Sequence, residues 1–153
     1  MRDYSLYVLT DEHLSRGKSH VELARLAAEG GADVIQLRDK HLESRQLYET
    51  ALEISKICRQ HDVLFIVNDR VDIALAAKAD GVHVGQGDIP AAVLRKFVPP
   101  DFIIGVSAGT AEEALQQIKE KHYALPFEAD SRKLLRIGVN FSSRTRNIEK
   151  WLG

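Results

Sequence analysis

The chain has 153 residues, which is enough for one domain with a buried core. Hydrophobic residues make up 44% of the chain, charged residues 28%, and the formal net charge is -1, so no basic surface for nucleic acid is indicated. No apolar run approaches the roughly 18 residues that a membrane-spanning helix requires. The first residues show no signal-peptide hydrophobic region, and the single cysteine excludes an internal disulfide framework, so we expect a cytoplasmic protein.

Short apolar runs alternate with helical patterns along most of the chain. Strands are predicted at residues 5–9, 33–37, 64–67, 81–84 and 102–106. Helices are predicted at residues 19–29, 44–60, 71–78, 90–97 and 110–119. Five strand-helix units in strict alternation, joined by short loops, predict a parallel sheet with helical crossovers.

The pattern weakens after residue 119. Residues 121–131 have no clear period and contain Pro126. We expect a sixth strand at residues 134–141 (L-L-R-I-G-V-N-F). Residues 142–153 are expected to form a loop and a last helical turn or two.

Polar residues follow the second strand, at the end where the loops of a parallel sheet carry binding groups. Gln36, Arg38 and Lys40 lie two residues apart, so they point the same way as long as the chain stays extended. Two positive charges in such a row suit a polyanion such as a diphosphate. The alternative is that Arg38 and Lys40 only form ion pairs with Asp39, Asp69 or Asp88.

Polar groups also follow the next three strands. Asn68 and Asp69 end the third strand, Asp88 follows the turn after the fourth, and Ser107 ends the fifth. Two carboxylates suit Mg²⁺, which takes oxygen ligands and often carries substrate phosphates. Either aspartate could instead cap the helix that follows it, and Ser107 could be an ordinary loop residue rather than a donor to phosphate.

Three motifs carry a resemblance to a known family. They are G-A-D-V-I-Q-L-R-D-K (31–40), V-N-D-R-V-D-I-A-L-A-A-K-A-D-G-V-H-V-G-Q-G-D (67–88) and I-I-G-V-S (103–107). In order and spacing they closely resemble thiamine phosphate synthase over about residues 4–117. The resemblance implies a TIM-barrel-type (β/α) fold, here an incomplete one with five to six of eight units, in a single domain over residues 1–153 that diverges over 120–153.

The resemblance also implies an activity. The family is a group of Mg²⁺-dependent transferases of thiamine biosynthesis that join 4-amino-5-hydroxymethyl-2-methylpyrimidine diphosphate to a thiazole phosphate and release pyrophosphate. The diphosphate leaves first, and the thiazole nitrogen attacks the resulting pyrimidine cation. Carried over by motif, the site has Asp69 and Asp88 as Mg²⁺ ligands, Lys40 and Ser107 as catalytic residues, and Gln36, Arg38, Lys40, Asn68 and Ser107 as substrate-binding residues.

The chain departs from the family pattern after about residue 117. The family's glycine-rich phosphate loop is not found, and residues 136–146 resemble its T-x-T-K loop only weakly, with Arg146 at the lysine position. A barrel of this type has at least about 200 residues. An incomplete barrel leaves unpaired sheet edges, so we also expect self-association through those edges, a covered edge or poor stability.

Two other functions stay open. One is a truncated, non-catalytic paralogue that binds phosphate or Mg²⁺. The other is a thiazole tautomerase-like protein, a group that typically has a histidine directly after G-V-S, where this chain has Ala108. Partners are expected to be small-molecule substrates, with neither nucleic acid nor a membrane.

Overall fold

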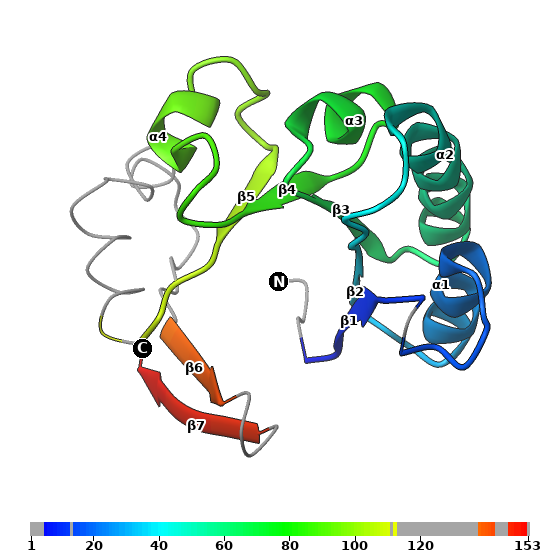
Figure 1. The fold of residues 1–153 in the computed structure, drawn as a ribbon, viewed down its shortest axis with the longest axis horizontal. Coiled ribbons are helices and arrows are strands. Elements are labelled where there is room, and N and C mark those ends of the chain that lie inside the picture. The colour runs from blue at the N-terminus through cyan, green and yellow to red at the C-terminus, as the bar shows by residue number, and fades with distance from the viewer. Residues whose placement is uncertain (1–4, 13, 111, 113–137, 143–146, 153) are drawn as a thin grey trace. The chain divides into compact units, whose positions relative to one another are not determined.

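A computed structural model describes residues 5–12, 14–110 and 112, and the backbone of residues 138–142 and 147–152 (Figure 1). The chain divides into two compact units. The first comprises residues 1–83 and 102–105, and the second comprises residues 84–101 and 106–153. That the whole chain acts as a single domain stays a prediction.

Five strands form one sheet in which their spatial order follows their order in the chain. Neighbouring strands from the first to the fourth pair in parallel. The parallel (β/α) architecture predicted from the sequence is therefore confirmed for the first five strands. They are β1 (Tyr7–Thr10), β2 (Val34–Leu37), β3 (Leu64–Asn68), β4 (Gly81–Val84) and β5 (Ile103–Val106).

The helices between these strands begin close to their predicted starts. They are α1 (His20–Glu29), α2 (Ser44–Gln60), α3 (Val71–Ala76) and α4 (Ala91–Leu94). Ser19 caps α1, since its hydroxyl accepts the amide of Glu22 at 3.2 Å. The left-handed φ of 86° at Gly31 lets the chain turn away after α1.

The fourth helix is shorter than the predicted span of residues 90–97. Pro90 is its N-cap, and the helix ends at Leu94. Beyond that point the amides of Lys96 and Phe97 bond to carbonyls three residues back, at 3.1 Å each. The end of the predicted helix is therefore a tighter turn than an α-helix.

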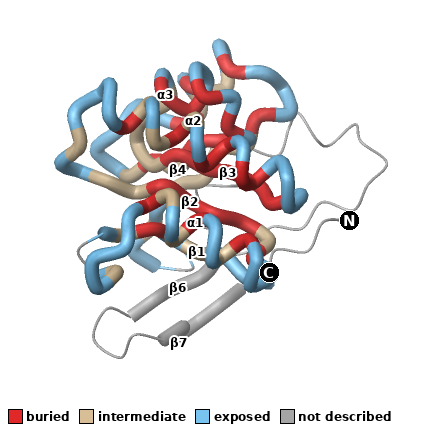
Figure 2. Tube along the Cα trace, turned by 90° about the vertical axis from the view of Figure 1, so that its right-hand side faces the viewer, coloured by how far each residue is buried: buried red, intermediate tan, exposed pale blue. Residues whose placement is uncertain are grey.

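The two faces of the sheet differ in what covers them. One face packs against α1, α2 and α3, which lie side by side along it in Figure 1. Figure 2 shows the resulting continuous buried layer along β2 and β3. The alternating strand residues of this layer are 0–2% exposed: Ile35, Leu37, Phe65, Val67 and Val82.

The opposite face is apolar at its centre. Val34, Leu64 and Ile66 form a buried cluster against which Ile103 packs. A cavity of about 270 Å³ lies over this cluster and is also lined by Tyr7, His83 and Gly105. The polar residues Gln36 and Asn68 follow on the same face, because each lies two residues beyond an apolar member of the cluster.

The C-terminal part differs from the prediction. β6 (Gly138–Ser142) and β7 (Asn147–Leu152) form an antiparallel sheet of their own, so the strand expected at residues 134–141 does not join the parallel sheet. The helical turns expected at the end of residues 142–153 are wrong, since β7 occupies residues 147–152. The backbone register pairs Val139 with Trp151 and Phe141 with Ile148. The helix predicted over residues 110–119 falls almost entirely outside the described residues.

Candidate functional site

Gln36 lies at the centre of the polar groups of the first unit and is only 3% exposed. Its Oε1 accepts the Tyr7 hydroxyl at 2.8 Å, and its Nε2 donates to Asn68 Oδ1 at 2.8 Å. Burial raises the pKa of Tyr7 to about 12, so the phenol keeps the proton that it donates. These bonds fix the orientation of the Gln36 amide and bring two of the predicted binding residues, Gln36 and Asn68, into direct contact.

β2 ends at Leu37 and Lys40 lies in a bend, so the extended chain that would align Gln36, Arg38 and Lys40 does not continue to Lys40. The half-buried Arg38 places its Nη1 3.7 Å from Asp11 Oδ2, and Lys40 is exposed. The ion pair of Arg38 is therefore made with Asp11 and not with the aspartates that the sequence suggested.

Asp69 occupies the turn between β3 and α3. Its backbone is left-handed, with φ of 61°, and its amide donates to the carbonyl of His83 at 2.7 Å. The N-cap of α3 is Arg70, without a side-chain capping bond, so the alternative that Asp69 caps this helix is not supported. Burial lowers the pKa of His83, and the nearby Asp69 carboxylate opposes that effect.

Asp88 and Ser107 belong to the second unit. Asp88 Oδ2 accepts the amide of Gly85 at 2.7 Å and closes the turn after β4. It does not cap α4, whose N-cap is Pro90. The Ser107 amide donates to Val84 at 2.9 Å, and the side-chain amide of Gln86 donates to the Ser107 carbonyl. The turn after β4 and the end of β5 are thereby joined.

The candidate ligands for a metal ion are the carboxylates of Asp69 and Asp88. Among the residues that the structure describes, no group of three or more His, Cys, Asp or Glu side chains is arranged to hold a metal. Mg²⁺ is commonly bound through one or two carboxylates, with water and substrate phosphates completing its shell. Asp69 lies in the first unit and Asp88 in the second, so the binding of one Mg²⁺ by both carboxylates stays a prediction.

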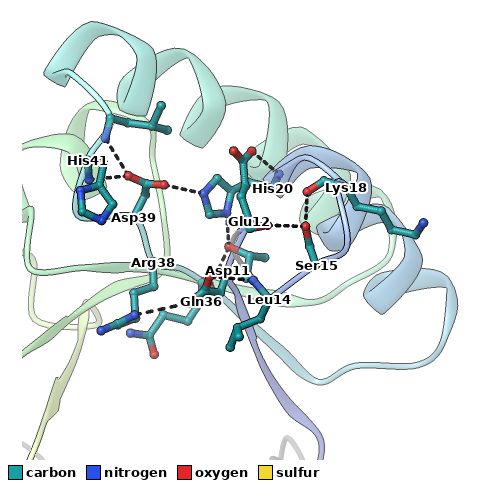
Figure 3. A network of polar contacts seen from close by, with 12 residues as sticks. Asp11, Glu12, Leu14, Ser15, Lys18, His20, Gln36, Arg38, Asp39 and His41 are labelled. Atoms are coloured by element: carbon teal, nitrogen blue, oxygen red, sulfur yellow. Dashed lines mark hydrogen bonds and ion pairs between the residues drawn. The ribbon is translucent and has the colours of Figure 1, made fainter.

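Sequence reasoning missed a polar network beside Arg38. The buried His20 contacts Thr10 at 2.7 Å and Asp39 at 3.0 Å (Figure 3). The positions of two residues could have indicated this network. Thr10 ends β1 and His20 begins α1, so both lie at the same end of the sheet as the predicted site.

Fold and site together define a class: parallel (β/α) proteins that present amides, cations and carboxylates at the carboxyl ends of their strands. The family model described as thiamine monophosphate synthase matches residues 6–125. The chain belongs to this family.

Relatives support the same family. The chain is 54% identical over 117 residues to thiamine-phosphate synthase of Methanoculleus marisnigri, covering 76% of this chain and 56% of the relative. It is 58% identical over 113 residues to the synthase of Methanocella arvoryzae, covering 74% and 53%. The chain thus spans about half the length of the curated relatives that it matches.

A solved structure agrees with the fold. Thiamine phosphate pyrophosphorylase from Pyrococcus furiosus superposes with a TM-score of 0.70 at 44% sequence identity, covering 77% of this chain and 56% of that one. Over the part of the chain that the structure describes, no helix is long and apolar enough to span a membrane.

A second family model, that of the PD-(D/E)XK nuclease superfamily, matches residues 104–151. This range contains the antiparallel pair β6 and β7. The match covers less than half of the chain and overlaps the first match over residues 104–125. The second match continues beyond residue 125, where the first match ends.

Proposed function

We propose that this chain acts as a thiamine-phosphate synthase, joining a pyrimidine diphosphate to a thiazole phosphate with release of pyrophosphate. The observation that carries the proposal is the match over residues 6–125 together with the Gln36–Asn68 contact at the strand ends. The chemistry needs a leaving diphosphate whose charge is stabilised. Fixed amides and nearby cations are suited to that task.

Each predicted residue has a role in this proposal. Arg38 and Lys40 offset the charge of the diphosphate, while the paired amides of Gln36 and Asn68 donate to its oxygens. Ser107 contacts the substrate or the departing pyrophosphate. Asp69 and Asp88 hold Mg²⁺, which would neutralise charge on the leaving group. The substrates are small molecules, and a cytoplasmic setting stays a prediction.

The test is pyrophosphate release by the purified 153-residue chain, supplied with the pyrimidine diphosphate, the thiazole phosphate and Mg²⁺. Asp69→Asn is the variant of choice, because asparagine tolerates the left-handed backbone that residue 69 adopts. We expect release that requires all three components and that falls by at least about tenfold in this variant, since loss of even a group that supports a metal ligand costs about 10–100-fold.

The matched control is Asp72→Asn, in the first turn of α3. Asp72 is exposed and pairs with Arg70 at 2.6 Å. Its substitution removes one negative charge, as Asp69→Asn does, but it removes no predicted metal ligand. It should retain nearly full turnover. A folded wild-type chain that releases no pyrophosphate would contradict the proposal and favour the alternative of a non-catalytic relative, which the half-length match also leaves open.

A further inference from the structure

A chain of hydrogen bonds ties the loop that carries Arg38 and Lys40 to the first strand and the first helix (Figure 3). Its centre is His20, which is 1% exposed. His20 Nδ1 lies 2.7 Å from Thr10 Oγ1, and its Nε2 lies 3.0 Å from Asp39 Oδ2. Thr10 Oγ1 in turn lies 3.4 Å from the carbonyl of Gln36 in β2.

The second oxygen of Asp39 shapes the loop itself. Asp39 Oδ1 accepts the amides of His41 at 2.6 Å and Leu42 at 2.7 Å. A side chain that binds the amides two and three residues ahead closes a turn in the way a backbone carbonyl would. Lys40 lies inside this turn and Arg38 directly before it, so the conformation of both depends on Asp39.

The direction of the His20–Asp39 bond follows from the charge on Asp39. Burial alone would raise the pKa of Asp39, but the hydrogen bonds from His20, His41 and Leu42 outweigh it and lower the pKa to about 2. An ionised carboxylate can only accept hydrogen bonds, so His20 Nε2 carries a proton and donates it to Asp39. His20 thereby holds the carboxylate that holds the loop.

We propose that His20 and Asp39 are positioning residues, which fix the loop over residues 38–42 so that Arg38 and Lys40 meet a diphosphate in a set geometry. The inference rests on the proposed function, because it assigns the loop to diphosphate binding. A loop held in advance loses less conformational entropy when its cations close on an anion, so the network raises affinity without touching the ligand.

Two substitutions of His20 separate this role from simple structural support. His20→Gln carries its amide nitrogen at about the reach of Nε2 and can still donate to Asp39. His20→Asn is one methylene shorter and loses that bond. Both variants place a polar, uncharged side chain in the same buried position.

The measurement is calorimetric titration of the 153-residue chain with Mg²⁺ and inorganic pyrophosphate, together with amide hydrogen exchange at residues 41 and 42 by NMR. We expect His20→Asn to weaken pyrophosphate binding about tenfold, a loss typical of one hydrogen bond to a charged group, and to speed exchange at both amides. His20→Gln should stay close to wild type in both readouts. Lys40→Ala should weaken binding while leaving the exchange unchanged.

Two results would overturn the inference. One is a folded His20→Asn chain that binds pyrophosphate as tightly as the wild type. The other is equal loss of binding in His20→Gln and His20→Asn, which would mean that the site tolerates no change at His20 whatever the bond to Asp39. A wild-type chain that binds no pyrophosphate overturns the proposed function as well, and the wild-type titration distinguishes that failure from the other two.

Discussion

Asp39 lies between two cationic residues in the sequence, yet its carboxylate bonds to neither of them. Its oxygens accept the His20 imidazole and the amides of His41 and Leu42 instead. The carboxylate thereby shapes the backbone beneath Arg38 and Lys40, while the ion-pair partner of Arg38 is Asp11.

Asp39 makes the free energy of unfolding depend on pH. Its pKa is lowered from 3.8 to about 2, so its stabilising contribution is present above pH 3.8 and is lost as the pH falls toward 2. We expect the wild type to lose more free energy of unfolding than Asp39→Asn when the pH is lowered from about 5 to about 2.5, because the variant has no proton to gain there. Urea unfolding followed by circular dichroism measures both.

The control for this comparison is Glu49→Gln, which removes an exposed carboxylate from α2. It should follow the wild-type pH dependence closely. If Asp39→Asn and the wild type lose equal stability over the same interval, the bonds to Asp39 do not stabilise the fold.

The sequence predicted which polar residues follow the strands, but not the partners of their side chains. Gln36 and Asn68 were both predicted to bind substrate at strand ends, and the structure places their side-chain amides in contact. The His20–Asp39 bond depends on how α1 is rotated over the sheet, and the periodicity of the sequence does not specify that rotation. The partner of Arg38, Asp11 directly after β1, was not foreseen either.

The approach of β4 to β5 depends on two glycines. A Cβ at Gly81 would lie 2.4 Å from the carbonyl oxygen of Ile103, and a Cβ at Gly105 would lie 2.5 Å from His83 Nδ1. The first contact is with backbone, which cannot rotate away as a side chain can. The strands therefore require glycine at position 81 to keep their spacing.

We expect Gly81→Ala to lower the free energy of unfolding by about 1–3 kcal/mol, the usual cost of overpacking. Gly87→Ala is the matched control, because nothing lies within 4 Å of its Cβ position. Chemical denaturation of the two variants and the wild type provides the measurement. Equal stability of Gly81→Ala and Gly87→Ala would show that β4 and β5 are not packed as described.

Most elements of the first unit were predictable from the spacing of their apolar residues, and some helices also have clear start and end signals. Ser19 and Gly31 at the two ends of α1 are examples. The β6–β7 pair was not foreseen, since its stability as a hairpin depends on a cross-strand register that includes an irregularity at Asn140 and Phe141.

The open sheet is the feature of the whole molecule with the clearest consequence. Among the described strands β1 and β5 lie at the edges, and β1 with the residue before it exposes Leu6, Tyr7 and Leu9 at 45%, 42% and 52%. Exposed apolar edge strands favour pairing with another chain. We therefore expect self-association that increases with protein concentration, measured by sedimentation equilibrium.

Leu9→Lys should reduce this association, because a charge on an edge strand disfavours pairing. Leu26→Lys is the matched control, since Leu26 is 47% exposed but lies on α1. A monodisperse wild-type monomer at every concentration would contradict the expectation.

The similarity to the synthase family extends over only part of the chain. The motifs predicted the family over the first part of the chain, and the loss of those motifs predicted that the similarity would end near residue 117. The family match ends at residue 125, and a different family model covers residues 104–151. The sequence motifs gave no sign of that second similarity.

The most direct test of the central claim, that the strand ends bind a diphosphate with Mg²⁺, is the affinity of the chain for the pyrimidine diphosphate with and without the metal. We expect Mg²⁺ to strengthen binding, and Lys40→Ala to weaken it by at least about tenfold, as removal of one charge-assisted contact should do. A folded chain whose affinity is unaffected by both the metal and the substitution would contradict the claim.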